Sequence, residues 1–173
     1  MTAPELRVGV SELRRRPGNR MQLDRSVPLG PLAISSSSIP EGEEVLLSAT
    51  LEALSDGVTL SGSVQVPWQG ECRRCLEMTS GVVTVEIAEI FKDRTEGELG
   101  EILPISNDSI DLGSVVHDAA ILALPIAPLC KADCAGPIPE VFPVITPETA
   151  EADPIDPRWA SLGELRFDSD PSE

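Results

Sequence analysis

The sequence predicts an α+β fold: a curved antiparallel sheet or partial barrel, one covering helix, a four-cysteine zinc knuckle and a short C-terminal helix. Apolar and polar residues alternate on both sides of an Asp-Gly dipeptide at residues 56–57, which is typical of an antiparallel hairpin. Apolar residues then repeat at helical spacing over residues 112–123. The four cysteines form two closely spaced pairs, one before and one after that helix.

The chain is long enough for one domain with a hydrophobic core. Aromatic residues make up 3% of the 173 residues and tyrosine is absent, so the core has to be aliphatic. We expect an N-terminal arm over residues 1–20, a single α+β domain over residues 21–136 and a proline-rich acidic segment over residues 137–173. Within the arm, the residues from Ser11 onward resemble the start of a helix that Pro17 ends early.

The strongest strand signal is the hairpin. Its two halves alternate in polarity around Asp56-Gly57, which predicts a type I′ turn. Pro104 limits the pairing of a short edge strand over residues 102–105. The other predicted strands span residues 21–28, 32–38, 45–53, 58–66 and 81–91.

One helix is predicted ahead of the second cysteine pair. Asp108 or Asp111 can cap its N-terminus, and Pro125 ends it. This helix should cover one side of the sheet and return the second cysteine pair to the first. Its apolar face consists of Leu112, Val115, Val116, Ala119 and Ala123. A second, short helix is predicted over residues 157–166, where Pro157 suits the first turn.

The two cysteine pairs favour a structural zinc site. Cys72 and Cys75 are separated by two residues and Cys130 and Cys134 by three, and each pair can supply two ligands from one turn. Thiols without a metal, packed as small apolar groups, are the first alternative. A redox-active Cys-x-x-Cys is the second, but no βαβ pattern surrounds it and the distant pair would have no role.

We expect a cytoplasmic protein that does not enter a membrane. The N-terminus lacks a basic region followed by an apolar stretch. The longest apolar stretch, residues 119–129, is short and contains Pro125 and Pro128, so it cannot span a bilayer. A cytoplasmic location keeps thiols reduced, and reduced clustered thiols favour metal binding.

The net charge of −16 is distributed unevenly. Residues 1–25 contain six arginines and three acidic residues, whereas the remainder contains seven basic and 26 acidic residues. Such acidity weighs against nucleic-acid binding through a broad electropositive face. It either keeps the protein soluble or forms a surface for a basic partner such as a ribosomal protein.

Four motifs follow one another along the chain in the same order as in a known protein family. Residues 10–18 read Val-Ser-Glu-Leu-Arg-Arg-Arg-Pro-Gly, and residues 62–77 contain a strand that leads into Cys-Arg-Arg-Cys-Leu. A helix over residues 110–125 precedes the second cysteine pair, and residues 156–160 read Asp-Pro-Arg-Trp-Ala. Together these motifs resemble the YceD family of ribosomal-RNA accumulation proteins.

The resemblance covers roughly residues 7–165. It implies a non-enzymatic role in the accumulation of large-subunit ribosomal RNA, and hence in ribosome biogenesis. Many members of the family carry two further cysteines shortly after the second pair, where this chain has Ile138 and Val141. Either the four cysteines of this chain suffice for one metal site, or this member of the family has lost part of a larger one.

The sequence shows no constellation typical of an enzyme. His117 is the only histidine and lacks the spacing of a catalytic triad or dyad, and no glycine-rich phosphate loop is present. Basic residues beside the thiols either stabilise a negatively charged zinc–thiolate site or touch RNA phosphates. The candidate RNA or partner contacts are Arg73, Arg74, Lys131, Trp68, Arg14, Arg15 and Arg16. For Trp68 the alternative is core packing, and for the arginine run it is a solvated surface.

Two functional hypotheses remain open. In the first, the protein is an assembly factor that contacts ribosomal RNA or a pre-ribosomal particle. In the second, it is a chaperone-like protein whose acidic surface holds a basic ribosomal protein. A thiol redox protein is a distant third.

Overall fold

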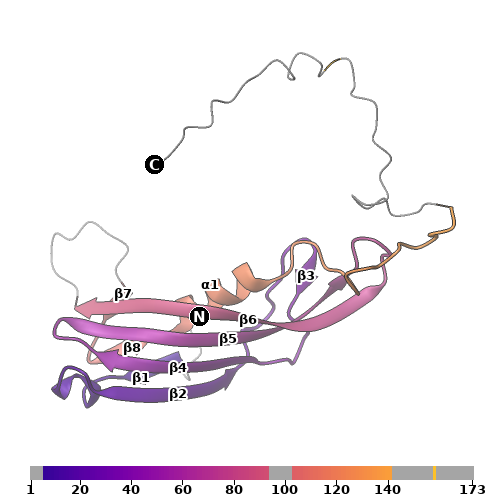
Figure 1. The fold of residues 1–173 in the computed structure, drawn as a ribbon. Helices are drawn as coiled ribbons and strands as arrows, with labels where there is room; N and C mark the ends of the chain where they lie inside the picture. Colours follow the sequence, from indigo (N-terminus) through magenta and orange to yellow (C-terminus); the bar gives the residue numbers. More distant parts are fainter. Residues whose placement is uncertain (1–5, 94–102, 142–157, 159–173) are drawn as a thin grey trace, which may run out of the picture. The chain divides into compact units, whose positions relative to one another are not determined.

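The computed structural model of the 173-residue chain describes residues 6–93, 103–141 and 158 (Figure 1). The chain divides into two units, Met1–Pro137 and Ile138–Glu173. The described strands and helices belong to the first unit and are β1 (Arg7–Gly9), the 3-10 helix η2 (Leu13–Arg15), β2 (Arg20–Val27), β3 (Ser37–Ser38), β4 (Val45–Ala53), β5 (Gly57–Glu71), β6 (Met78–Asp93), β7 (Leu103–Ile105), β8 (Ser109–Asp111) and α1 (Gly113–Ala123).

The main sheet has the strand order β2-β4-β5-β6-β7, and β3 pairs with β5 outside this path. Neighbouring strands are antiparallel except β6 and β7, which are parallel. β1 and β8 form a separate two-stranded sheet. The predicted antiparallel sheet is therefore confirmed apart from the parallel pair β6–β7, and the main sheet is open rather than closed into a barrel.

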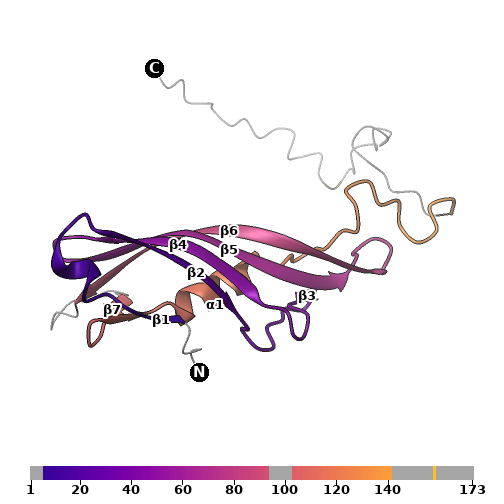
Figure 2. The same ribbon diagram turned by 90° about the horizontal axis from the view of Figure 1, so that it is seen from below.

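One face of the main sheet carries the hydrophobic core. On β4, Val45, Leu47, Ala49, Leu51 and Ala53 are buried, while the residues that alternate with them are exposed or half-buried. The register places Leu51 opposite Leu60 of β5, so both strands present apolar side chains to the same side. α1 lies against β5 and β6 and contributes side chains such as Val116 to this core (Figure 2). The predicted hairpin and its single covering helix are therefore confirmed.

The turn between β4 and β5 differs from the predicted type I′ turn. Its central residues are Ser55 and Asp56, and the Leu54 amide closes it by donating a 2.9 Å hydrogen bond to the Gly57 carbonyl oxygen. A type I′ turn needs a positive φ at both central residues, and neither has one. Gly57 is required for space instead, because a Cβ there would lie 2.3 Å from the carbonyl oxygen of Phe91.

The residues before β2 contribute to the core as well. β1 pairs with β8, and the Val10 amide donates a 2.7 Å hydrogen bond to the Asp108 carbonyl oxygen. Leu6, Val8, Val10 and Leu13 are all buried. Four apolar side chains from the segment expected as an arm therefore belong to the same cluster as the sheet.

Three of the predicted features differ in the structure or lie outside the residues that it describes. The N-cap of α1 is Leu112 rather than Asp108 or Asp111, although the Gly113 amide donates a 2.8 Å hydrogen bond to Asp111 Oδ1. Of the strand predicted over residues 32–38, only the two residues of β3 are regular. The helix predicted over residues 157–166 lies outside the described residues, apart from Arg158.

β5 and β6 continue beyond β4 as a long hairpin arm. The last pair between β4 and β5 joins Leu46 to Gln65. β5 and β6 stay paired as far as Glu71 and Met78. The arm, residues 66–71 and 78–83, therefore carries the cysteine-containing loop between β5 and β6 past the end of β4 (Figure 1).

Candidate metal centre

The loop between β5 and β6 places the first two thiols on one tight turn. The Cys72 amide donates a 2.8 Å hydrogen bond to the Glu77 carbonyl oxygen, and the Leu76 amide donates one of 2.8 Å to the Cys72 carbonyl oxygen. Leu76 has a φ of 64°. This left-handed conformation costs a non-glycine residue about 1–2 kcal/mol. The Leu76 side chain is 67% exposed, so burial does not offset that cost.

The segment after α1 brings the second cysteine pair to the first. The hydroxyl groups of Ser36 and Ser37 both donate to the carbonyl oxygen of Pro125, at 3.0 and 2.9 Å. The carbonyl oxygen of Pro128 then accepts a 2.9 Å hydrogen bond from the Arg73 amide. The chain is therefore tied to β3 and to the first cysteine loop before it reaches Cys130.

The four thiols converge. The Sγ atoms of Cys72 and Cys134 are 3.8 Å apart, and those of Cys75 and Cys130 are 3.7 Å apart. All four sulfur atoms lie within 4.8 Å of one another, and none is in a disulfide. A tetrahedral ion with zinc–sulfur bonds of about 2.3 Å separates its ligands by about 3.8 Å. The arrangement can therefore hold a metal ion, and its dimensions fit zinc.

The pKa values of the thiols are shifted in opposite directions. Hydrogen bonds from the backbone amides of Cys75 and Cys130 lower the pKa of Cys72 to about 6. A hydrogen bond with the Cys134 thiol raises the pKa of Cys130 to about 12. Sulfur atoms this close cannot all ionise without a compensating charge, because each thiolate disfavours the next. A divalent cation supplies that charge and displaces the protons.

Arg74 connects the two cysteine loops. Its Nη1 atom donates hydrogen bonds to the carbonyl oxygens of Ala132, at 3.1 Å, and Cys134, at 2.8 Å. The Arg73 side chain is instead exposed, and Lys131 Nζ lies at the surface, 3.9 Å from an Asp133 carboxylate oxygen. Of the three cations beside the thiols, one holds the second loop and two face solvent.

The other predicted contacts do not share one surface. Trp68 is half-buried on β5, and its indole lies against Gly81, where a Cβ would be 3.1 Å from the ring. Arg14 forms an ion pair with Asp93, the last residue of β6. The 16-residue β6 therefore separates the Arg14-Arg15-Arg16 run from the cysteine loop by about 50 Å.

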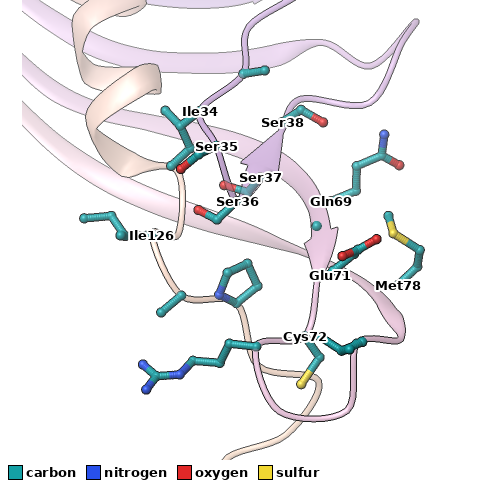
Figure 3. A pocket seen from close by; sticks show the side chains of 16 residues that line it. Ile34, Ser35, Ser36, Ser37, Ser38, Gln69, Glu71, Cys72, Met78 and Ile126 are labelled. Carbon is teal, nitrogen blue, oxygen red and sulfur yellow. The ribbon is translucent and has the colours of Figure 1, made fainter.

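A cavity of about 630 Å³ lies beside the first cysteine loop (Figure 3). Four consecutive serines, residues 35–38, line one part of it. Exposed apolar side chains from Leu76, Met78 and Ile126 line another part, together with Arg73. Analysis of the sequence did not single out these apolar residues. No sequence signal marked them, because the left-handed backbone of Leu76 is a conformation that leucine rarely adopts.

Comparison with known proteins places these features in a family context. A family model described as "Large ribosomal RNA subunit accumulation protein YceD" matches residues 60–166, a range that includes both cysteine pairs. Uncharacterized proteins of Mycobacterium tuberculosis (strain ATCC 25618 / H37Rv) and Mycobacterium bovis are each 34% identical over 173 residues, covering 94% of this chain and 82% of the relative. An uncharacterized protein of Mycobacterium leprae is 31% identical over 163 residues, covering 90% of this chain and 75% of the relative.

No solved structure matches the chain. Within residues 6–93, 103–141 and 158, no helix has both the length and the apolar character needed to cross a membrane.

Proposed function

The chain belongs to the YceD family, and from this premise we propose that it is a non-enzymatic ribosome-biogenesis factor that supports accumulation of large-subunit ribosomal RNA. The family description names an accumulation protein rather than a catalyst. In this role the protein acts in the cytoplasm, on ribosomal RNA or a pre-ribosomal particle. One observation carries the mechanism below: four thiols converge at the end of a hairpin arm with two exposed cations beside them.

The metal in this proposal is a single structural zinc ion held by Cys72, Cys75, Cys130 and Cys134. The sulfur separations support zinc, and the free thiols are the ligand type that zinc prefers. When bound, the ion fixes the loop between β5 and β6 to the segment after α1. Because ligands so far apart in sequence meet only in the folded chain, the binding energy of the ion stabilises the fold.

Arg73 and Lys131 are the proposed phosphate contacts. Both flank the thiols and both reach solvent, whereas Arg74 is engaged with backbone carbonyl oxygens. They form a small basic site on an acidic chain, which suits a local contact with RNA rather than a broad electrostatic face. Trp68 supports the arm by packing on Gly81. The Arg14-Arg15-Arg16 run is a separate basic site at the other end of β6.

The test is salt-dependent binding to large-subunit ribosomal RNA. Arg73→Glu/Lys131→Glu should weaken binding and lower the slope of log affinity against log salt by about 2, because two phosphate contacts are lost. Arg7→Glu/Arg25→Glu makes the same charge change at exposed positions on β1 and β2. If both double variants bind equally well, the proposed contacts are wrong.

The acidic composition supports a second candidate function, in which the protein is a chaperone-like binder of a basic ribosomal protein. Pull-down from growing cells at low salt separates the two functions when RNA and protein are both identified. Loss of ribosomal RNA from Arg73→Glu/Lys131→Glu with retained ribosomal-protein binding supports the first function. A wild-type pull-down that contains the ribosomal protein without ribosomal RNA, with the ribosomal protein still bound by the variant, supports the second.

A further inference from the structure

One edge of β6 is open over most of its length. β5 pairs with β6 from Met78 to Lys92, which is all of β6 except its last residue. On the other side, β7 pairs only with residues 91–93. Among the described residues no strand pairs with this side of residues 78–90, and Figures 1 and 2 show β6 at the border of the sheet there. The open edge, residues 78–90, is about 40 Å long.

The composition of this edge suits strand pairing. It contains no proline, and five of its residues are β-branched apolar residues: Val82, Val83, Val85, Ile87 and Ile90. β-branched residues favour the extended conformation. Proteins usually protect such edges with charges, bulges or short strands.

The opposite border of the sheet shows that protection. β2 has eight residues, three of which are charged: Arg20, Asp24 and Arg25. The longer open edge of β6 carries only Glu86 and Glu89. The border formed by β6 is therefore the one that can accept an additional strand, whereas the charges on β2 protect the opposite border from such pairing.

The core beside β6 is also incomplete. Val83 and Val85 face the same side as the buried residues Val66 and Val64 of β5, yet they are only half-buried. Another strand beside β6 would place alternate side chains against them. Such a strand would gain backbone hydrogen bonds and apolar burial together.

We propose that this edge of β6 binds an extended, lysine- or arginine-rich segment of a partner protein by strand addition. Glu86 and Glu89 lie on opposite sides of the strand, so each side of an added strand would meet one carboxylate. Opposite charges on neighbouring strands stabilise pairing, and like charges oppose it. The inference concerns a surface that the proposed RNA contact does not use.

Two other occupants are disfavoured by charge. A second copy of the chain would bring another pair of glutamates to the edge and a net charge of −16 with it. The chain's own residues 142–173 contain eight acidic and two basic residues, so their charge does not complement the two glutamates either. Like-charge repulsion therefore selects a basic partner over both.

The probe is a synthetic capped nonapeptide of alternating valine and lysine, measured by calorimetry on the full zinc-loaded chain. We expect binding together with protection of backbone amides in residues 78–90 from hydrogen exchange. Two isomers, N-methylated at one or the other set of alternate residues, test the backbone contact. Only the isomer whose methyl groups face β6 should lose more than about tenfold in affinity, because strand addition uses one edge of the peptide.

Matched charge reversals test the edge itself. Asp24, Ser48, Ser63 and Glu86 form one row across the sheet, so Glu86→Lys and Asp24→Lys make the same change at opposite borders. Glu86→Lys should weaken peptide binding about fivefold or more, and Asp24→Lys should change it much less. Equal effects of the two variants, equal binding of both methylated isomers, or dimerisation of the chain through β6 would each overturn the proposal. None of these measurements involves RNA, so the proposed function is tested separately.

Discussion

Arg74, which lies between the first two cysteines in sequence, donates a 2.8 Å hydrogen bond to the backbone carbonyl oxygen of Cys134, the last of the four. A second bond from the same Nη1 atom reaches the Ala132 carbonyl oxygen. This arginine joins two loops that are otherwise joined through the four thiols and one backbone hydrogen bond, from Arg73 to Pro128. It therefore holds the second cysteine loop against the first.

The first prediction concerns this arginine. Arg74→Ala should lower the free energy of unfolding by about 1–3 kcal/mol, because two carbonyl oxygens lose a charged donor. It should also weaken zinc binding, since the second loop is no longer held in place. Denaturant unfolding and competition with a chromophoric zinc chelator measure the two effects. Arg73→Ala, an exposed neighbour, is the control, and equal losses in both variants would contradict the role of Arg74.

The second prediction is that metal removal destabilises the domain. Purified protein should contain one zinc ion per chain, and chelation should lower Tm by about 10 °C or more, because metal binding contributes to folding. Elemental analysis and a thermal melt check this. Cys72→Ser/Cys134→Ser should melt at the lower temperature with or without chelator. An unchanged melt after chelation of zinc-loaded wild type would exclude a structural ion.

The third prediction concerns the strained residue of the first cysteine loop. Leu76→Gly should be more stable than Leu76→Ala by about 1 kcal/mol, because only glycine adopts the φ of 64° without steric cost. Chemical denaturation of the two zinc-loaded variants gives the difference. Both variants also remove an exposed side chain from the cavity. A matching loss of RNA binding in both would add Leu76 to the contact surface, whereas equal stability of the two would show that its backbone is unstrained.

The fourth prediction is a pH effect at the β4–β5 turn. A hydrogen bond and ion pair with Lys92, at 3.0 Å, hold the pKa of the Asp56 carboxyl below its ordinary value of 3.8. The lowered pKa means that the pair stabilises the folded state above about pH 4 and that this contribution is lost as the pH falls through the folded-state pKa. NMR titration should show the Asp56 midpoint moving upward in Lys92→Met. No movement would mean that Lys92 is not the cause.

The hairpin of β4 and β5 was predictable because alternation of side chains is a local property of a strand. The ends of its second strand were not. The pattern placed the end of that strand at residue 66, whereas β5 continues to Glu71 through Pro67. A proline disrupts pairing only where its missing amide would have bonded a neighbour. β4 pairs with β5 only as far as Gln65. At Pro67, β5 therefore has no neighbour on the β4 side that could miss the proline amide.

The candidate site divides in the same way. The spacing of the cysteines was enough to propose that two turns share one ion, because each pair lies within reach of a common centre. The separate tasks of Arg73 and Arg74 could not be read from sequence, since adjacent basic residues look alike until one of them meets a carbonyl oxygen of another loop. The distance between the cysteine loop and the Arg14-Arg15-Arg16 run depends on the full length of β6.

By itself, the sequence determined the strand alternation, the apolar helix and the paired thiols, because each of these depends on residues close together along the chain. It also determined the acidic charge, which depends on composition alone. Only the tertiary structure decided which cation holds the second cysteine loop, that Leu6 and Val8 enter the core, and that one side of β6 stays unpaired. These outcomes depend on which distant segments come into contact and on the register of the paired strands. Local sequence patterns determine neither.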